Sequence, residues 1–221
     1  MTRARRWLEL GASLLLAPSC GSQGHDEIPK ELLDAIANAD GPLDAYPEPP
    51  YGGEVGEVAR NVCFDAWEDP KASDFEPTAL RRTCLADFFQ PNTTERSLLL
   101  INTAAIWCQA CQTEYAGSGT RPSLNEEVQE RWPDGLRALG GLFQDAAGQP
   151  ASAEDAARWA RTFDVEFPFG VDSDFVLGAF ANPELQPMNM LVDTSSMRIL
   201  LKLQTDDPGT LWQTVDEFLE R

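Results

Sequence analysis

The chain has 221 residues, enough for one medium-sized domain and a tail. It carries 36 acidic and 17 basic side chains, and this net charge of −19 argues against binding to nucleic acid or anionic lipid headgroups. A surface of this kind attracts cationic partners instead. The single histidine, His25, lies in a small polar segment near the N-terminus, so Ser–His and Cys–His catalysis are excluded.

The first twenty residues have the pattern of an export signal. Three arginines precede a short apolar segment, 10–17, and the small residues Ala17-Pro18-Ser19 lead to Cys20. The apolar segment is too short to span a membrane. We therefore predict a signal peptide over residues 1–19, and its removal changes the net charge to −21.

Two outcomes at Cys20 stay open. The site resembles a bacterial lipobox, in which Cys20 is lipidated and becomes the first residue of a membrane-anchored lipoprotein. Ala17 and Pro18 depart from the usual lipobox, and ordinary signal-peptidase cleavage would cut the same bond and leave the thiol free. We prefer lipidation, and in both cases the protein leaves the cytoplasm.

Residues 20–54 are predicted to be a flexible tether. Gly21 to Pro29 is small and polar, residues 31–39 suit a short helix, and residues 41–53 are dense in proline and glycine. The folded domain is therefore expected to cover residues 55–221.

Apolar alternation, apolar runs and capping residues predict the elements of this domain. The chain has no internal repeat. The first half should contain an edge strand or hairpin over 55–67, a short helix through 89 capped by Thr83, a central strand over 98–102, a helix over 108–115 and a helix from 122 or 123 to 132. A strand over 136–144, a helix capped by Ser152 with Asp155, a strand over 167–171 and a short helix over 175–181 should follow. The chain should end with a strand–turn–strand hairpin over 188–203 and an amphipathic helix with Leu211, Val215, Phe218 and Leu219 on one face.

This order predicts an α/β fold around a mixed sheet. Helices between consecutive strands allow those strands to pair in parallel, whereas the short turn of the hairpin over 188–203 forces an antiparallel edge.

The central strand leads into the most informative motif of the chain. After Asn102 and a short turn come Trp107 and then Cys108-Gln109-Ala110-Cys111, which opens a predicted helix. At a helix start the unpaired N–H groups and the helix dipole favour the thiolate of Cys108, the form that attacks disulfides. Cys111, one turn further in, is placed to resolve a mixed disulfide. The alternative is an inert structural disulfide.

Strand, Asn102, W-C-x-x-C and Glu114 three residues later together resemble the thioredoxin superfamily. Within it, the motif is most similar to the extracytoplasmic TlpA/ResA-like thiol–disulfide oxidoreductases, or redoxins, and a looser resemblance extends from Gly56 to the C-terminus. The resemblance implies a thioredoxin-like three-layer sandwich with an N-terminal extension. It also implies that the protein acts on protein thiols and disulfides, with no cofactor and no metal.

The residues around the cysteines have expected roles. Trp107 is expected to be part of the core, to shield the thiol and offer partners a flat contact, or to do both. Gln109 and Ala110 tune the redox potential. Asn102 stands where cytoplasmic thioredoxins have a buried Asp, and an amide cannot accept a proton at neutral pH. Glu114 is therefore the candidate proton acceptor for Cys111, with a solvated helix carboxylate as the alternative.

The resemblance also implies a cis-proline before the strand that faces the C-x-x-C motif. Gln186-Pro187-Met188 matches that position, with Pro183 and Pro168 as rivals. Only about 5–6% of X–Pro bonds are cis in general, so this prediction depends on the resemblance. Met188 is expected to offer partners a soft apolar contact.

Two cysteines remain, Cys63 and Cys84. Outside the cytoplasm we expect them to form a structural disulfide, which stabilises the fold by roughly 3 kcal/mol on the chain-entropy model. Two buried free thiols are the alternative. A zinc site is disfavoured, because it would require these cysteines to converge on a motif placed at a helix start.

The sequence thus predicts an extracytoplasmic, lipid-anchored thiol–disulfide oxidoreductase on the periplasmic or cell-surface side of a bacterial membrane. If it acts as a reductant, it needs an electron donor such as a membrane thiol transporter. The sequence does not choose between reduction and oxidation. The alternatives are a redox-inactive thioredoxin-fold module that binds a cationic protein, and a thiol peroxidase.

Overall fold

The computed structural model describes residues 28, 30–37, 45–93 and 95–220, so the predicted signal peptide and Cys20 lie outside the described residues. The α-helices are α1 (Lys30–Ala37), α2 (Gln109–Ala116), α3 (Leu124–Arg131), α4 (Ala153–Thr162) and α5 (Pro208–Leu219), and the 3-10 helices are η1 (Leu85–Phe88), η2 (Trp132–Asp134) and η3 (Val176–Ala179). The strands are β1 (Tyr51–Gly52), β2 (Val58–Ala59), β3 (Cys63–Trp67), β4 (Arg81–Cys84), β5 (Leu98–Ala105), β6 (Leu136–Gln144), β7 (Phe169–Val171), β8 (Met188–Asp193) and β9 (Ile199–Leu203).

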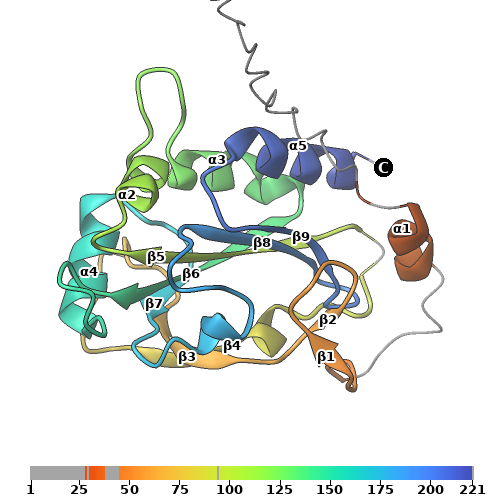
Figure 1. Ribbon diagram of the computed structural model, residues 1–221, viewed down its shortest axis with the longest axis horizontal. Helices are drawn as coiled ribbons and strands as arrows, with labels where there is room; N and C mark the ends of the chain where they lie inside the picture. The colour runs from red at the N-terminus through yellow and green to blue at the C-terminus, as the bar shows by residue number, and fades with distance from the viewer. Residues whose placement is uncertain (1–27, 29, 38–44, 94, 221) are drawn as a thin grey trace, which may run out of the picture.

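A mixed sheet forms the middle of the molecule, with the strand order β4-β3-β7-β6-β5-β8-β9 (Figure 1). Strands β5, β6 and β7 pair in parallel, because α3 and α4 lie in the connections between them. The β8–β9 hairpin is antiparallel, as is its pairing with β5. The predicted α/β fold with a central mixed sheet and flanking helices is confirmed.

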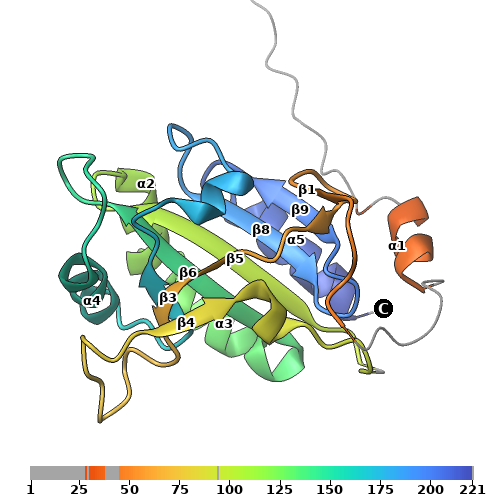
Figure 2. The same ribbon diagram turned by 90° about the horizontal axis from the view of Figure 1, so that it is seen from below.

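Strand β5 shows how the two faces of the sheet are built. Figure 2 shows it between β6 and β8, and all of its residues are buried. Leu98 and Leu100 pack in the core that includes residues of α2, α3, α4 and α5, whereas Leu99 and Ile101 pack in a second core with residues of η1 and η3. This alternation follows from the two-residue period of a strand. Asn102 is thereby directed to the helical face.

One of the two predicted helix caps is confirmed: Ser152 Oγ accepts the Asp155 N–H at 3.2 Å. Helix α3 begins at Leu124, just after the predicted start at 122 or 123, and Ser123 caps it by accepting the Glu126 N–H at 3.2 Å. The other predicted cap, Thr83, was wrong by one residue: Thr83 pairs with Phe64 in the β3–β4 ladder, and this pairing keeps it extended. Cys84 takes the capping position of η1 instead.

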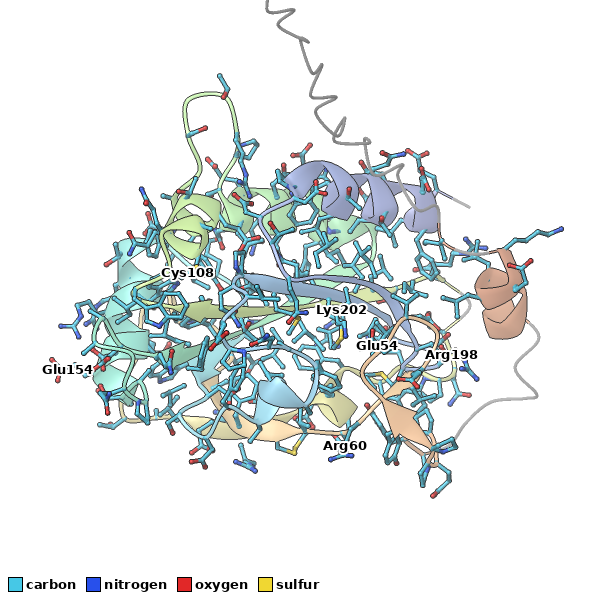
Figure 3. The ribbon with its side chains drawn as sticks, viewed as in Figure 1. Glu54, Arg60, Cys108, Glu154, Arg198 and Lys202 are labelled. Atoms are coloured by element: carbon cyan, nitrogen blue, oxygen red, sulfur yellow. A yellow bond between two sulfur atoms is a disulfide. The ribbon has the colours of Figure 1, made fainter. Side chains whose placement is uncertain are left out.

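Part of the predicted tether packs on the domain. The Tyr46 hydroxyl donates to the Ala59 carbonyl at 2.7 Å, and its ring lies 5.7 Å from that of Phe89. Lys202 Nζ, from β9, donates to the Gly53 carbonyl at 2.6 Å and contacts Glu54 at 2.7 Å (Figure 3). The folded part of the chain therefore begins before the predicted boundary at residue 55. None of the helices described is both long and apolar enough to cross a membrane.

Candidate active site

Cys108 and Cys111 form a disulfide at the start of α2, beyond the end of β5 (Figure 3). Cys108 is the N-cap residue of this helix, and its Sγ accepts the Cys111 N–H at 3.0 Å. A backbone donor aimed at the sulfur from a helix N-terminus is the arrangement that stabilises a thiolate after the disulfide is reduced.

The two cysteines differ in exposure in the predicted order. Cys108 is 4% exposed and Cys111 is fully buried. Trp107, directly before them, is 41% exposed, and its Nε1 donates to Gln144 Oε1 at 2.8 Å. Trp107 is therefore held on the surface beside Cys108, and the alternative that it belongs to the core was wrong. Gln109 is also exposed.

The segment before β8 lies at the same end of the sheet. Thr103 pairs with Met188, and β5 continues from Thr103 toward Cys108. The Gln186–Pro187 peptide is cis, as predicted, whereas those before Pro183 and Pro168 are not. Thr103 Oγ1 donates to Gln186 Oε1 at 2.6 Å and so ties the turn to β5.

The expected side-chain contact from this turn needs correction. Pro187 and Met188 are buried, and Met188 packs in the second core beside η3. The period of β8 directs Met188 to the face opposite Asn189, so its side chain cannot meet a partner. The exposed apolar residue of the turn is Leu185, at 48%, and its N–H donates to the Asn182 carbonyl at 3.1 Å. Sequence reasoning missed Leu185, because an isolated leucine in a polar loop carries no periodic signal.

A buried polar network lies beneath the disulfide on the helical face of the sheet. Asn102 Nδ2 donates to Glu114 Oε2 at 2.9 Å and to Asn189 Oδ1 at 2.8 Å. Asn189 Nδ2 donates to Glu114 Oε1 at 2.5 Å, and the Tyr115 hydroxyl donates to Asn102 Oδ1 at 2.8 Å. Every polar side-chain oxygen in this group is satisfied, as burial requires.

Glu114 is the titratable centre of this network. It follows Cys111 by one helical turn and is 2% exposed, so the alternative of a solvated helix carboxylate was wrong. Burial raises the pKa of Glu114 to about 7, while the hydrogen bonds from Asn189 and Asn102 act in the opposite direction. A carboxyl group that titrates near neutral pH can both accept and release a proton in the same medium.

Sequence reasoning missed Asn189 and Tyr115 as members of the site. A weak signal existed for Asn189, since it is the only amide within the otherwise apolar run of β8 before Asp193. Tyr115 is fully buried and also packs edge-on against Trp159, with 5.3 Å between the rings. Its hydroxyl contact with Asn102 depends on the packing of α2 against β5, which no local pattern reveals.

Cys63 and Cys84 form the second disulfide. They face each other directly in the β3–β4 ladder, with 4.0 Å between their Cα atoms. The alternative of two free thiols was wrong, and a zinc site built from all four cysteines is incompatible with two disulfides.

Solved structures share this fold. No protein-family model and no curated protein matches the chain. A Chlorobium tepidum protein proposed to be the thiol:disulfide interchange protein DsbE has a TM-score of 0.52 and 16% identity, over 75% of this chain and 98% of its own. A DsbF homologue from Corynebacterium diphtheriae has a TM-score of 0.51 and 16% identity, over 80% and 99% of the two chains. A secreted thiol-disulfide isomerase from Corynebacterium glutamicum has a TM-score of 0.51 and 13% identity, over 82% and 100%. At such identities the likeness establishes the fold: the chain has the thioredoxin-like architecture of these proteins.

Proposed function

We propose that the protein exchanges disulfides with protein substrates through Cys108 and Cys111. One observation carries this proposal: the sulfur of Cys108 sits at the N-cap of α2, bonded to Cys111 and accepting its N–H. In the reducing direction, the Cys108 thiolate attacks one sulfur of a substrate disulfide and the other substrate sulfur leaves as a thiolate. Cys111 then attacks Cys108, which restores the disulfide and releases the second substrate thiolate. The substrate gains two electrons and the cysteine pair loses two; the reverse sequence is oxidation.

Glu114 would take the proton of Cys111 in this scheme. Cys111 must become a thiolate before it can attack, and its thiol is fully buried. Glu114 lies one turn along the same helix and has a pKa of about 7, so near neutral pH it is partly ionised and ready to accept that proton. Asn102, as an amide, orients Glu114 through the 2.9 Å hydrogen bond and does not titrate.

Trp107 and Leu185 are proposed to contact the substrate. They are two of the three large apolar side chains that are well exposed among the described residues, and each stands next to one of the two turns that flank the disulfide. Gln186, half-buried before the cis bond, would offer its backbone to an extended substrate segment. The net charge of −19 favours substrates with basic residues near their cysteines.

We also propose an extracytoplasmic location with a lipid anchor at Cys20 and recharging by a membrane thiol transporter. Support comes from the leader pattern of the sequence. The test is to express the full chain with and without Cys20→Ala in a bacterium and to follow fatty-acid labelling and membrane association. Lipidation requires that labelling disappear in the variant.

The function is tested with wild type, Cys108→Ser and Cys111→Ser. Wild type should reduce insulin with a dithiol as electron source, Cys108→Ser should not, and Cys111→Ser should accumulate mixed disulfides with substrates. The equilibrium redox potential of the pair then indicates the direction of electron flow.

The binding module is the second candidate, favoured by the 4% exposure of Cys108 in the closed disulfide. Unchanged partner binding, with no exchange activity in wild type or in Cys108→Ser, would support it. Peroxide consumption that depends on Cys108, without insulin reduction, would indicate a thiol peroxidase instead.

A further inference from the structure

Thr103 is a buried polar residue in an apolar row of β5. It continues the row of Leu99 and Ile101, so it faces the second core, on the side of the sheet opposite Asn102. Its side chain is fully buried. Among the described residues its hydroxyl has one hydrogen-bond partner, Gln186 Oε1, to which it donates at 2.6 Å. Thr103 therefore holds the amide of Gln186 from inside the sheet.

The amide of Gln186 continues this link into the exposed loop before β8. Its Oε1 accepts from Thr103, while its Nε2 donates to the Asn182 carbonyl at 3.2 Å. The same carbonyl accepts the Leu185 N–H at 3.1 Å. A chain of hydrogen bonds thus runs from the core of the sheet to the backbone of the exposed leucine.

Asn182 fixes the rest of this loop. Its Oδ1 accepts the Glu184 N–H at 2.9 Å, and its own N–H donates to Gln204 Oε1 at 2.5 Å, just after the end of β9. The loop is therefore tied to β5 by Thr103 and to the end of β9 by Gln204. Of these two ties, the one through Thr103 belongs to the strand that leads into α2 and its disulfide.

This arrangement gives Leu185 a fixed position beside the disulfide of α2. Leu185 is 48% exposed, and a side chain that is held in place beforehand loses less freedom on meeting a substrate than a mobile one does. Thr103 faces away from Glu114, because Asn102, which binds Glu114, lies on the other face of β5. A change at Thr103 should therefore alter binding and leave the chemical step as it is.

We propose that Thr103 is a positioning residue for substrate binding, which fixes Leu185 at the surface through the amide of Gln186. The inference rests on the proposed function, in which Leu185 contacts a protein substrate. Thr103 itself touches neither the substrate nor the reacting sulfurs. Its signature is a change in KM for substrates that are large enough to reach Leu185.

The test compares Thr103→Val with wild type in insulin reduction at a saturating concentration of dithiol. Valine has nearly the shape of threonine and suits a strand, but it cannot donate to Gln186. We expect the KM for insulin to rise about threefold to tenfold, with kcat close to that of wild type. Reduction of a small aromatic disulfide, which does not extend to Leu185, should keep its wild-type rate. Thr103→Ser keeps the hydroxyl and should keep the wild-type KM.

Thr194→Val is the matched control. Thr194 is also fully buried, and its hydroxyl donates to the Ser97 carbonyl at 3.1 Å, but it follows β8 at the end of the strand far from Cys108. Loss of this hydrogen bond should leave both kinetic constants unchanged. If Thr103→Val does not fold, Gln186→Met breaks the same chain of hydrogen bonds from its other side and should raise KM in the same way.

Two further measurements show whether Thr103 acts through Leu185. In a Leu185→Ser background, Thr103→Val should cause no further rise in KM, because the side chain that it positions is already lost. In the absence of substrate, NMR relaxation of the Leu185 amide should show lower order in Thr103→Val than in wild type or in Thr194→Val.

A wild-type KM in Thr103→Val would overturn the inference and leave the proposed function intact. An effect that adds fully to that of Leu185→Ser, or an equal rise of KM in Thr194→Val, would also overturn it, since either result would separate the effect from the position of Leu185. If wild type itself shows no exchange that depends on Cys108, the proposed function fails, and this role of Thr103 fails with it.

Discussion

The two disulfides are the same bond in two different settings. Cys108–Cys111 joins residues three apart at a helix start, with 5.3 Å between the Cα atoms. Cys63–Cys84 joins residues 21 apart across an antiparallel pair of strands at the edge of the sheet. The first has a backbone N–H aimed at its sulfur, an exposed tryptophan beside it and a buried acid beneath it.

In the proposed function, this difference separates a bond that cycles from one that supports the fold. A long closed loop restricts the unfolded chain more than a short one, so Cys63–Cys84 contributes more to stability than Cys108–Cys111 does. Conversely, the start of α2 supplies a donor to the sulfur of Cys108 and, in the proposed function, a nearby group to receive a proton. We therefore expect substitution of Cys108 to lower activity most, and substitution of Cys63 and Cys84 to lower the free energy of unfolding most.

The largest effect is expected from Cys108→Ser. Because a serine hydroxyl is a far weaker nucleophile than a thiolate, insulin reduction should fall to background. The Cys63→Ala/Cys84→Ala double variant is the matched control, and below its unfolding midpoint it should reduce insulin at the wild-type rate. A strong loss of activity in the folded double variant would contradict the division of roles between the two disulfides.

The same double variant should show the next largest effect, on stability. Opening the loop of 21 residues should lower the free energy of unfolding by roughly 3 kcal/mol. Denaturant unfolding of oxidised protein measures this value. The Cys108→Ala/Cys111→Ala variant should lose less unfolding free energy. A larger loss in this variant than in Cys63→Ala/Cys84→Ala would contradict the larger stabilising role of the Cys63–Cys84 disulfide.

Glu114→Gln tests the buried acid that lies one helical turn after Cys111. In wild type the pKa of Glu114 rises from 4.5 to about 7 on folding, so the folded state binds the proton more tightly. Stability therefore falls as pH increases through this window, by about 3 kcal/mol if the whole shift is realised. In Glu114→Gln most of this fall should disappear, and denaturant unfolding at several pH values measures it.

A smaller fall in unfolding stability with rising pH should remain in Glu114→Gln, because Asp172 is buried and its pKa is raised to about 6. In the exchange reaction, wild-type activity should increase as pH rises toward 7 and Glu114 becomes ionised, whereas Glu114→Gln should be slow throughout. An unchanged rate profile in the variant would remove Glu114 from the mechanism.

The smallest effect is expected from Leu185→Ser. Losing an exposed apolar contact should lower kcat/KM for a protein substrate a few-fold, while reduction of a small aromatic disulfide stays unchanged. Val55→Ser is the control, since Val55 is 44% exposed and lies near Ile199, away from the active disulfide. Equal losses in both variants would show that general surface apolarity, and not this site, is responsible.

Local patterns in the sequence determined much of this protein. Apolar runs predicted β5, β6 and the β8–β9 hairpin, Ser152 marked the start of α4, and the C-x-x-C motif marked the start of α2. Each of these signals lies within a few residues of what it predicts, so propensity and capping suffice to read it. The cis bond before Pro187 was predicted through resemblance alone.

The tertiary structure decided what surrounds the cysteines. Glu114 became a buried acid because β8 brings Asn189 to it from 75 residues away, and Met188 was withdrawn from the surface by the register of β8 on β5. Thr103 contacts Gln186 for the same reason. Burial and hydrogen bonding between distant segments depend on how strands and helices pack, and this packing, more than any local motif, sets the protonation of the site.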